Sequence, residues 1–189
     1  MGLRPMRGSD ARAWSDVRLA NEVWLGQWEP RGTGGWAEQN APGLFPGRLR
    51  AVRRQARRGE LLPWAVTYEE RFAGQLTIGN VVRGAFQSAY VGYWVDGRLA
   101  GRGIIPTALA LAVDHCFRTV GLHRIEVNIR PENSASRRVV EKLGFREEAL
   151  HHRYLHIDGA WRDHIGYALT VEDVPQGLLS RWRTSRPSA

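Results

Sequence analysis

Residues 93–104 read Tyr-Trp-Val-Asp-Gly-Arg-Leu-Ala-Gly-Arg-Gly-Ile, and this stretch decides the fold. An aromatic and β-branched run ends at Val95, a glycine-bearing loop follows, and a helical pattern begins near Ile104. Gly101 and Gly103 lack a Cβ atom, so an anion can approach the backbone closely. Because backbone N–H groups near a helix N-terminus attract anions, the stretch predicts a strand–loop–helix unit that binds a phosphate or pyrophosphate.

Two well-known phosphate-binding loops do not match this stretch. A dinucleotide-binding Gly-x-Gly-x-x-Gly loop requires glycine at position 106, where the chain has Pro106. The Gly-Lys-Ser/Thr run of a P-loop is absent as well. A Gly-x-Gly pair alone is also compatible with an ordinary turn and helix cap. The surrounding elements are needed to distinguish that interpretation from a phosphate-binding loop.

Hydrophobic periodicity predicts a mixed order of elements around the loop. Three strands precede it without helices between them, which favours antiparallel neighbours. A polar stretch over residues 29–43 is expected to be a long loop, and Asp158-Gly159 predicts a type I′ hairpin. We expect helices over residues 10–26, 46–59, 104–121 and 134–143, and strands over residues 62–68, 73–82, 88–95, 124–129, 145–157 and 161–170.

The length of 189 residues predicts a single domain, and the order of the predicted elements gives it the α/β class with a mixed α+β sheet. We expect this domain to span residues 1–175 and to be followed by a polar C-terminal tail over residues 176–189, of which residues 180–189 are expected to be mobile. There is one cysteine, Cys116, which excludes a disulfide framework and a multi-cysteine zinc site. The opening residues lack the apolar region of a signal peptide, so we expect a cytoplasmic protein without a membrane partner.

The net charge of +8 is the unusual feature of the composition. Of the 27 basic residues all but Lys142 are arginine. Many of them lie on one face of the helix predicted over residues 46–59. That face can be merely solvated, can attract an acidic peptide or ribosomal RNA, or can lie near a phosphate-bearing ligand. The sequence leaves these three interpretations open.

The motif Arg98-x-x-Gly101-x-Gly103 resembles the loop with which acetyltransferases of the GNAT superfamily hold the pyrophosphate of coenzyme A. About thirty residues later, Asn133-x-x-Ser136 precedes a helix and a Leu-Gly-Phe run, which resembles the second half of the same site. The chain therefore resembles a GNAT acyl-CoA N-acyltransferase. This resemblance implies a mostly antiparallel central sheet flanked by helices, with acetyl-CoA as co-substrate and no metal.

Four further segments, residues 28–30, 80–84, 123–125 and 157–164, are similar to the RimJ branch of ribosomal-protein N-terminal acetyltransferases. They extend over nearly the whole chain. The first strand, expected near residues 3–6, is shorter than is usual in that branch. The resemblance implies a protein N-terminus as acceptor, with a ribosomal protein or the ribosome as partner and no requirement for nucleic acid.

The resemblance also implies roles for particular residues. Ser136 would meet the leaving coenzyme A sulfur, although it can equally satisfy backbone groups at its helix start. Glu29 could attract the acceptor amine or relay its proton, or could be a solvated loop charge, and Asp163 is a weaker candidate base. The expected coenzyme-binding residues are Trp94, Val95, Arg98, Leu99, Ala100, Gly101, Arg102, Gly103, Ile104, Asn133 and Arg137. The expected acceptor-binding residues are Trp28, Asn80, Arg83 and Tyr154.

The acceptor itself stays open at this level. An α-amine has a pKa of about 7.7–8.0 and is partly neutral near pH 7, whereas a lysine amine with a pKa near 10.4 is almost fully charged. A site without a strong base therefore suits an N-terminal amine. Two alternatives are a GNAT enzyme that acetylates a small amine, such as an antibiotic or an aminoacyl metabolite, and a ribosome- or RNA-binding module with a vestigial coenzyme site.

Histidines cluster late in the chain, at positions 151, 152, 156 and 164. On a strand, His152 and His156 share a face but lie roughly 13 Å apart, and neighbouring positions point to opposite faces. We therefore expect no metal site. The sequence does not distinguish a monomer from a homodimer.

Overall fold

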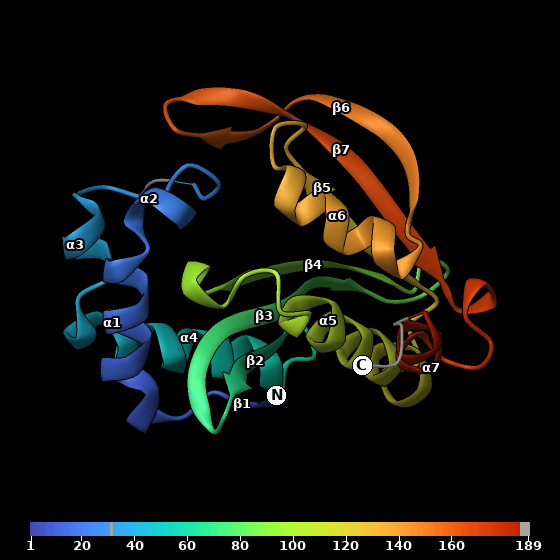
Figure 1. The fold of residues 1–189 in the computed structure, drawn as a ribbon, viewed down its shortest axis with the longest axis horizontal. Coiled ribbons are helices and arrows are strands. Elements are labelled where there is room, and N and C mark those ends of the chain that lie inside the picture. Colours follow the sequence, from blue (N-terminus) through green and yellow to red (C-terminus); the bar gives the residue numbers. More distant parts are fainter. Residues whose placement is uncertain (31, 186–189) are drawn as a thin grey trace.

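The computed structural model describes residues 1–30 and 32–185, and a seven-stranded sheet forms its centre (Figure 1). The strand order is β1-β2-β3-β4-β5-β7-β6, and all neighbours are antiparallel except β4 and β5. The strands are β1 (Gly2–Pro5), β2 (Leu62–Tyr68), β3 (Arg71–Val82), β4 (Ser88–Val95), β5 (Arg124–Ile129), β6 (Arg146–Ile157) and β7 (Ala160–Thr170). The helices are α1 (Ala11–Ala20), α2 (Glu22–Leu25), α3 (Trp36–Gln39), α4 (Phe45–Arg57), α5 (Ile104–His115), α6 (Ser134–Leu143) and α7 (Leu178–Thr184). This architecture confirms the predicted fold class.

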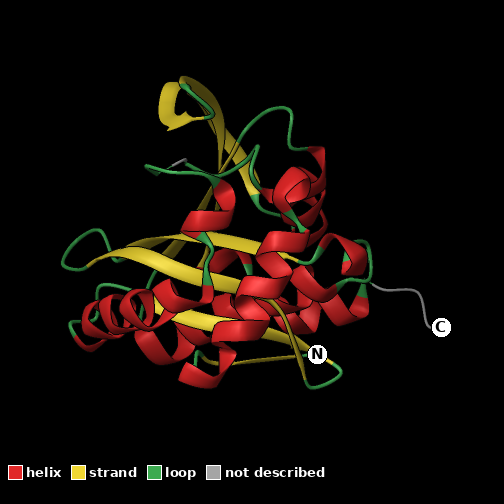
Figure 2. Cartoon of the chain, turned by 90° about the vertical axis from the view of Figure 1, so that its left-hand side faces the viewer, coloured by secondary structure: helices red, strands yellow, loops and turns green. Residues whose placement is uncertain are grey.

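The two faces of the sheet are covered by different helices (Figure 2). Side chains alternate between the faces of a strand. Val66 therefore belongs to the main core together with Leu109 of α5, whereas its neighbour Ala65 packs in a second cluster with Phe45 of α4. Among the helices of the described residues, none is long and apolar enough to cross a lipid bilayer.

The sheet opens between its two parallel strands. Residues 88–90 of β4 pair with residues 124–126 of β5, and no pairing continues beyond Tyr90 and Glu126. The last five residues of β4 and the last three of β5 therefore diverge. This separation leaves backbone groups of both strands available at the centre of the molecule, which is where the candidate site forms.

The N-terminal third differs from the predicted elements. The expected helix over residues 10–26 is interrupted at Asn21, whose side chain donates to Val17 O at 2.7 Å and accepts from Gly97 N at 2.8 Å. These bonds favour a non-helical backbone conformation at Asn21, with φ −120°, which ends α1. The expected long loop over residues 29–43 is also wrong in part, because α3 and a short 3-10 turn lie within it.

The expected polar tail is ordered up to residue 185, and its prediction as mobile is wrong there. Leu178 and Trp182 of α7 are buried against α5, and Trp182 Nε1 donates to Thr107 Oγ1 at 2.9 Å. The Asp114 carboxylate accepts from the N–H groups of Leu178 and Leu179. The sequence prediction missed that Leu178 and Trp182, four residues apart, form one apolar face of a helix. Residues 186–189 of the expected tail lie outside the described residues.

Candidate active site

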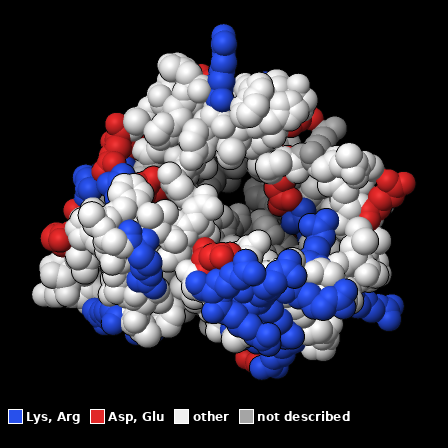
Figure 3. Space-filling view, turned by 180° about the vertical axis from the view of Figure 1, so that it is seen from behind, with Lys and Arg blue, Asp and Glu red and all other residues white. Residues whose placement is uncertain are grey.

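A cleft of about 1210 Å³ lies where β4 and β5 diverge. Its walls are formed by the ends of both strands, the loop after β4, the first turns of α5 and α6, and residues of the segment after α2. Viewed from behind, the surface is hollowed near its centre (Figure 3). The volume exceeds that of most drug-sized ligand pockets, so the cleft can hold a large co-substrate together with an acceptor.

The loop between β4 and α5 forms one end of the cleft. Gly101 and Gly103 have φ values of 80° and 75°, a region that favours glycine. Within the described chain, the N–H groups of residues 101–103 donate to no other residue. They lie at the N-terminus of the twelve-residue helix α5, where the helix dipole also favours an anion. These residues fit the pyrophosphate that the sequence predicts here.

The two arginines of this loop have different surroundings. Arg98 does not line the cleft, because its guanidinium binds Asp96 through Nε at 3.0 Å and Nη2 at 2.5 Å. Burial raises the pKa of Asp96, but hydrogen bonds from Arg98 and Asn21 outweigh this effect and leave the pKa below its ordinary value. Arg98 therefore shapes the loop, while Arg102 lines the cleft and is the arginine available to a phosphate.

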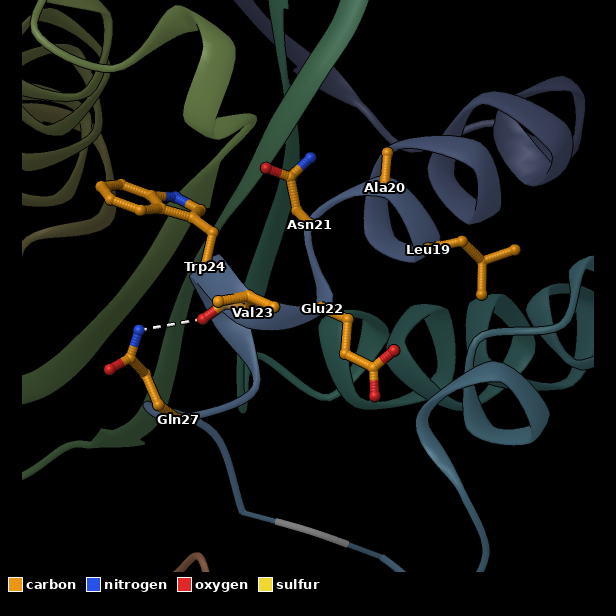
Figure 4. A pocket seen from close by; sticks show the side chains of 7 residues that line it. All are labelled: Leu19, Ala20, Asn21, Glu22, Val23, Trp24 and Gln27. Atoms are coloured by element: carbon orange, nitrogen blue, oxygen red, sulfur yellow. Dashed lines mark hydrogen bonds between the residues drawn. The ribbon is translucent and has the colours of Figure 1, made fainter.

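Trp24 holds the beginning of the same loop from the side of α2 (Figure 4). Its indole Nε1 donates to Val95 O at 3.2 Å. A Cβ atom at Gly97 would lie 3.1 Å from the Trp24 ring and from Asn21 Oδ1, so glycine permits this close approach. A shallow pocket formed by residues 19–24 and Gln27 lies on the outer side of this contact (Figure 4).

The end of β4 presents backbone groups to the cleft. Asp96 N donates to Ala73 O on β3 at 2.8 Å. Because successive N–H groups of a strand point to opposite sides, the N–H of Val95 points away from β3, toward the opening left by β5. The bond from Trp24 to Val95 O agrees with this orientation. An extended ligand can therefore pair with this edge of β4 as an added strand would.

Ser136 and Asn133 lie together at the start of α6, as the sequence predicts. The Asn133 side chain accepts from Ser136 N at 3.0 Å and caps the helix. Ser136 Oγ lies 2.9 Å from the hydroxyl of Tyr93, which extends from β4. Burial raises the pKa of Tyr93, so its hydroxyl stays protonated and can donate to Ser136. The sequence allowed Tyr93 to line a groove or merely to pack in the sheet, and did not predict its contact with Ser136.

Helix α6 also presents two cations that the sequence did not single out. Arg137, predicted to bind the coenzyme, does not line the cleft and instead donates to Tyr167 Oη at 3.1 Å and to Pro131 O. Arg138 and Lys142, four residues apart on one face of the helix, line the cleft instead. The structure thus places Arg138, one position further along the helix than the predicted Arg137, in the cleft wall.

Glu29 lines the cleft but is already engaged. Both of its carboxylate oxygens accept from the Arg18 guanidinium, one of them at 3.0 Å. Arg18 is buried and contacts the rings of three tryptophans, at 4.8–5.3 Å from the ring centroids. The three tryptophans are Trp14, Trp36 and Trp94. Glu29 is therefore the partner of a buried cation, and its carboxylate is poorly placed to act as a free base.

The segment that carries Glu29 is fixed a second time at the end of β5. Arg130 Nη1 donates to Gln27 O at 2.9 Å, and the Arg130 guanidinium lies 5.3 Å from the centroid of the Trp28 ring. Residues 27–29 thus contact α1 through Arg18 and β5 through Arg130. They form a bridge across one side of the opening between β4 and β5, and Trp28 on this bridge lines the cleft.

The other three expected acceptor-binding residues do not line the cleft. Asn80 and Arg83 lie at the far end of β3, because β3 runs antiparallel to β4 and its last residues lie beside the beginning of β4. Arg83 there donates to Val120 O at 2.8 Å. Tyr154 lies behind the wall, where its hydroxyl accepts from Asn128 Nδ2 at 3.2 Å.

The late histidines and Asp163 do not gather at one site. Among the described residues, no three His, Cys, Asp or Glu side chains gather as a metal site requires. Asp163 does not line the cleft. Its carboxylate accepts from Arg153 N at 2.8 Å, and its second oxygen lies 3.0 Å from His152 Nδ1. His164 alone among these histidines is buried in the cleft wall, and burial lowers its pKa.

Several cleft residues carry no local sequence signal. They come from elements that are distant in the chain and meet only in the folded protein. The most notable are Asn128, Arg130 and Trp182.

Comparison with known proteins connects this geometry to a family. A family model described as an acetyltransferase (GNAT) domain matches residues 1–146. The [ribosomal protein uS5]-alanine N-acetyltransferase of Escherichia coli is 32% identical over 177 residues, which cover 93% of this chain and 90% of that protein.

Solved structures of acetyltransferases are also similar to this chain. The structure of Mycobacterium smegmatis RimJ in complex with CoA-disulfide has a TM-score of 0.95 and 48% identity, and the match covers 97% of this chain and 88% of that one. A ribosomal-protein-S5-alanine acetyltransferase from Vibrio fischeri has a TM-score of 0.81 and 29% identity, with 90% of this chain and 93% of that one covered.

Proposed function

The chain belongs to the GNAT acetyltransferase family and is an acetyl-CoA-dependent N-acetyltransferase, and from this premise we propose that it acetylates the N-terminal α-amine of a ribosomal protein. The observation that carries the proposal is the opening between β4 and β5, which joins the glycine loop to a cleft. Among the described residues, the two carboxylates that line this cleft are each paired with an arginine, Glu29 with Arg18 and Glu132 with Arg130. The similarity to enzymes that modify ribosomal protein uS5 supports the acceptor class. Such an acceptor also implies a cytoplasmic location.

In this proposal the loop and α6 hold the coenzyme. The free N–H groups of residues 101–103 bind the pyrophosphate, and Arg102, Arg138 and Lys142 supply positive charge nearby. Asn133 contacts the pantetheine arm, which runs along the open edge of β4. The N–H of Val95 polarises the thioester carbonyl, because a donor aimed at developing oxyanion charge stabilises the transition state.

We propose direct transfer from acetyl-CoA to the acceptor within a ternary complex. The chain has one cysteine, and Cys116 is fully buried away from the cleft. Burial raises the pKa of the Cys116 thiol to about 12, so this residue is unsuited to carry the acetyl group. The C–N bond forms as the C–S bond breaks, and the proton lost by the amine passes to the departing thiolate, which leaves as the free thiol. Ser136 supplies a hydrogen bond to this sulfur, and Tyr93 in turn contacts the Ser136 hydroxyl.

The acceptor amine must be neutral to attack. An α-amine with a pKa of about 7.7–8.0 is neutral in roughly a tenth to a quarter of molecules near pH 7.2, whereas a lysine is neutral in well under about 1%. Since Glu29 is bound to Arg18, it attracts and orients the amine in this proposal and does not remove its proton. The bridge formed by residues 27–29 favours a flexible chain end that can enter past Trp28.

Mass spectrometry of acceptor peptides tests this function. Synthetic peptides with the N-termini of the host's ribosomal proteins, each with one internal lysine, are incubated with enzyme and acetyl-CoA. Acetylation at the N-terminus, and none when that amine is blocked, is the expected result. Transfer only to lysine side chains or only to small amines, such as aminoacyl compounds, would overturn the proposed acceptor.

A further inference from the structure

Helix α4 carries an unbroken basic face. The helix contains no Asp or Glu, and its side chains Arg50, Arg54 and Arg57 are all exposed. Their i, i+4, i+7 spacing places them in one row about 10 Å long, which we call the α4 arginine row. Within the described residues none of the three has an ion-pair or hydrogen-bond partner, whereas nearby Arg53 donates to Met6 O and Arg58 lies 3.8 Å from Glu60.

The opposite face of α4 supports the cleft. Phe45 and Leu49 are buried in a cluster that also contacts Trp94, and Trp94 lines the cleft. The α4 arginine row therefore lies on the solvent side of the helix whose other face packs against the cleft residue Trp94. Figure 3 shows Lys and Arg side chains gathered over α4, directly beside the hollow. The coenzyme loop belongs to the other face of the sheet, where α5 packs.

We propose that the α4 arginine row binds the phosphate backbone of double-helical RNA beside the acceptor opening. This inference rests on the proposed function, because a ribosomal protein presents its N-terminus next to RNA. Three guanidinium groups without acidic partners form a site that is complementary to a row of phosphates. RNA contact would then raise the local concentration of the acceptor terminus at the cleft, without a role in the transfer step itself.

The arrangement favours RNA over an acidic protein segment. The three arginines follow one another along one face of a thirteen-residue helix, and none of the other exposed residues of α4 is acidic. Guanidinium groups bind phosphate oxygens in pairs, and a regular backbone offers such groups at repeated intervals. Nothing in the row reads bases, so we expect binding that depends on salt and does not depend on sequence.

Binding of a fluorescently labelled RNA duplex of about 20 base pairs tests this inference across a series of salt concentrations. We compare the native chain with the double variant Arg54→Glu, Arg57→Glu. A control of equal charge change, Arg118→Glu, Arg183→Glu, lies on the other side of the sheet. Because Arg118 Nη2 donates to Gln176 O at 2.8 Å, the folding of this control is also checked by thermal unfolding. The α4 variant should bind the duplex at least about tenfold more weakly. Its slope of log affinity against log salt concentration should be about two units shallower, and the control should change much less.

Three outcomes would overturn the inference: equal losses in the two double variants, no binding of the duplex by the native chain, or equally tight binding of polyglutamate. The milder variant Arg54→Gln, Arg57→Gln, checked by thermal unfolding, separates loss of binding from loss of folding. Acetylation of a free N-terminal peptide is measured in the same proteins. It should be unchanged in the α4 variant, so failure of RNA binding is distinguishable from failure of the proposed function.

Discussion

The hydroxyl of Tyr93 lies 2.9 Å from Ser136 Oγ and joins the open edge of β4 to the first turn of α6. The two residues are 43 positions apart in the chain and come from the two walls of the cleft. Because burial keeps the Tyr93 pKa above its ordinary value of 10.0, Tyr93 remains a hydrogen-bond donor throughout the neutral range. Ser136 can then direct its own proton toward a group in the cleft.

Removing the Ser136 hydroxyl should slow turnover more than removing the Tyr93 hydroxyl. We expect Ser136→Ala to lower kcat by about a hundredfold and Tyr93→Phe by about tenfold, since only the first removes the group next to the leaving sulfur. Thiol release with a free N-terminal peptide as acceptor measures both. Acetyl-CoA affinity should change little, and equal turnover of Ser136→Ala and the native chain would remove Ser136 from its proposed role.

Two glycines provide a test of the pyrophosphate loop. Gly101 in the loop and Gly84 in the distant turn after β3 both have positive φ, 80° and 70°, and a Cβ atom added at either position would meet open space. Alanine should therefore cost a similar backbone penalty of about 1–2 kcal/mol at each position. We expect acetyl-CoA affinity, measured by calorimetry, to fall at least about tenfold for Gly101→Ala and to stay unchanged for Gly84→Ala. Similar affinities in the two variants would place the pyrophosphate elsewhere.

The pairing of Glu29 with Arg18 predicts how Glu29→Gln should behave. The amide can keep one bond to the guanidinium but not the charge, so the free energy of unfolding should fall by about 1–3 kcal/mol. We expect the KM for the acceptor peptide to rise several-fold while the pH profile of kcat keeps its shape, with exposed Glu22→Gln as the matched control. A large loss of kcat together with a displaced pH limb would instead identify Glu29 as the base.

The local features of the site were predictable from the sequence. The loop after β4 and the Asn133 cap with Ser136 depend on residues a few positions apart, and the motifs contain all of them. The pairing of Arg98 with Asp96 also spans only two positions, but the sequence motif implied that Arg98 binds the coenzyme and did not predict this pairing. Such short-range geometry is determined by turn and cap chemistry, which the sequence records directly.

The features that failed depend on long-range contacts. Glu29 and Arg18 meet only because three tryptophans form a buried environment around the guanidinium, and α7 is ordered because α5 offers it an apolar surface. Likewise, whether Arg137 or Arg138 faces the cleft depends on how α6 is rotated against the sheet. A one-residue difference in helical phase moves a side chain by about 100°, which no motif specified.

The buried ring of His164 predicts acid-sensitive stability in the wall of the cleft. Its Nδ1 lies 3.0 Å from Arg162 O, and burial lowers its pKa below the ordinary value of 6.5. The folded chain therefore keeps His164 neutral while the unfolded chain takes up a proton near pH 6.5. The resulting stability is fully present above about pH 6.5 and is lost as the pH falls toward the folded pKa, by up to about 1.4 kcal/mol per pH unit.

Urea unfolding between about pH 7.5 and about pH 5 measures this loss. The native chain should lose stability over that range, His164→Gln should lose less, and replacement of the exposed His156 by Gln should leave the native profile in place. The carboxylates whose pKa is lowered, such as Glu148 with an ordinary value of 4.5, lose their contribution only at still lower pH and do not mask the effect. Identical slopes in His164→Gln and the native chain would mean that another group governs the acid response, because the single titration that separates the two proteins is that of the buried imidazole.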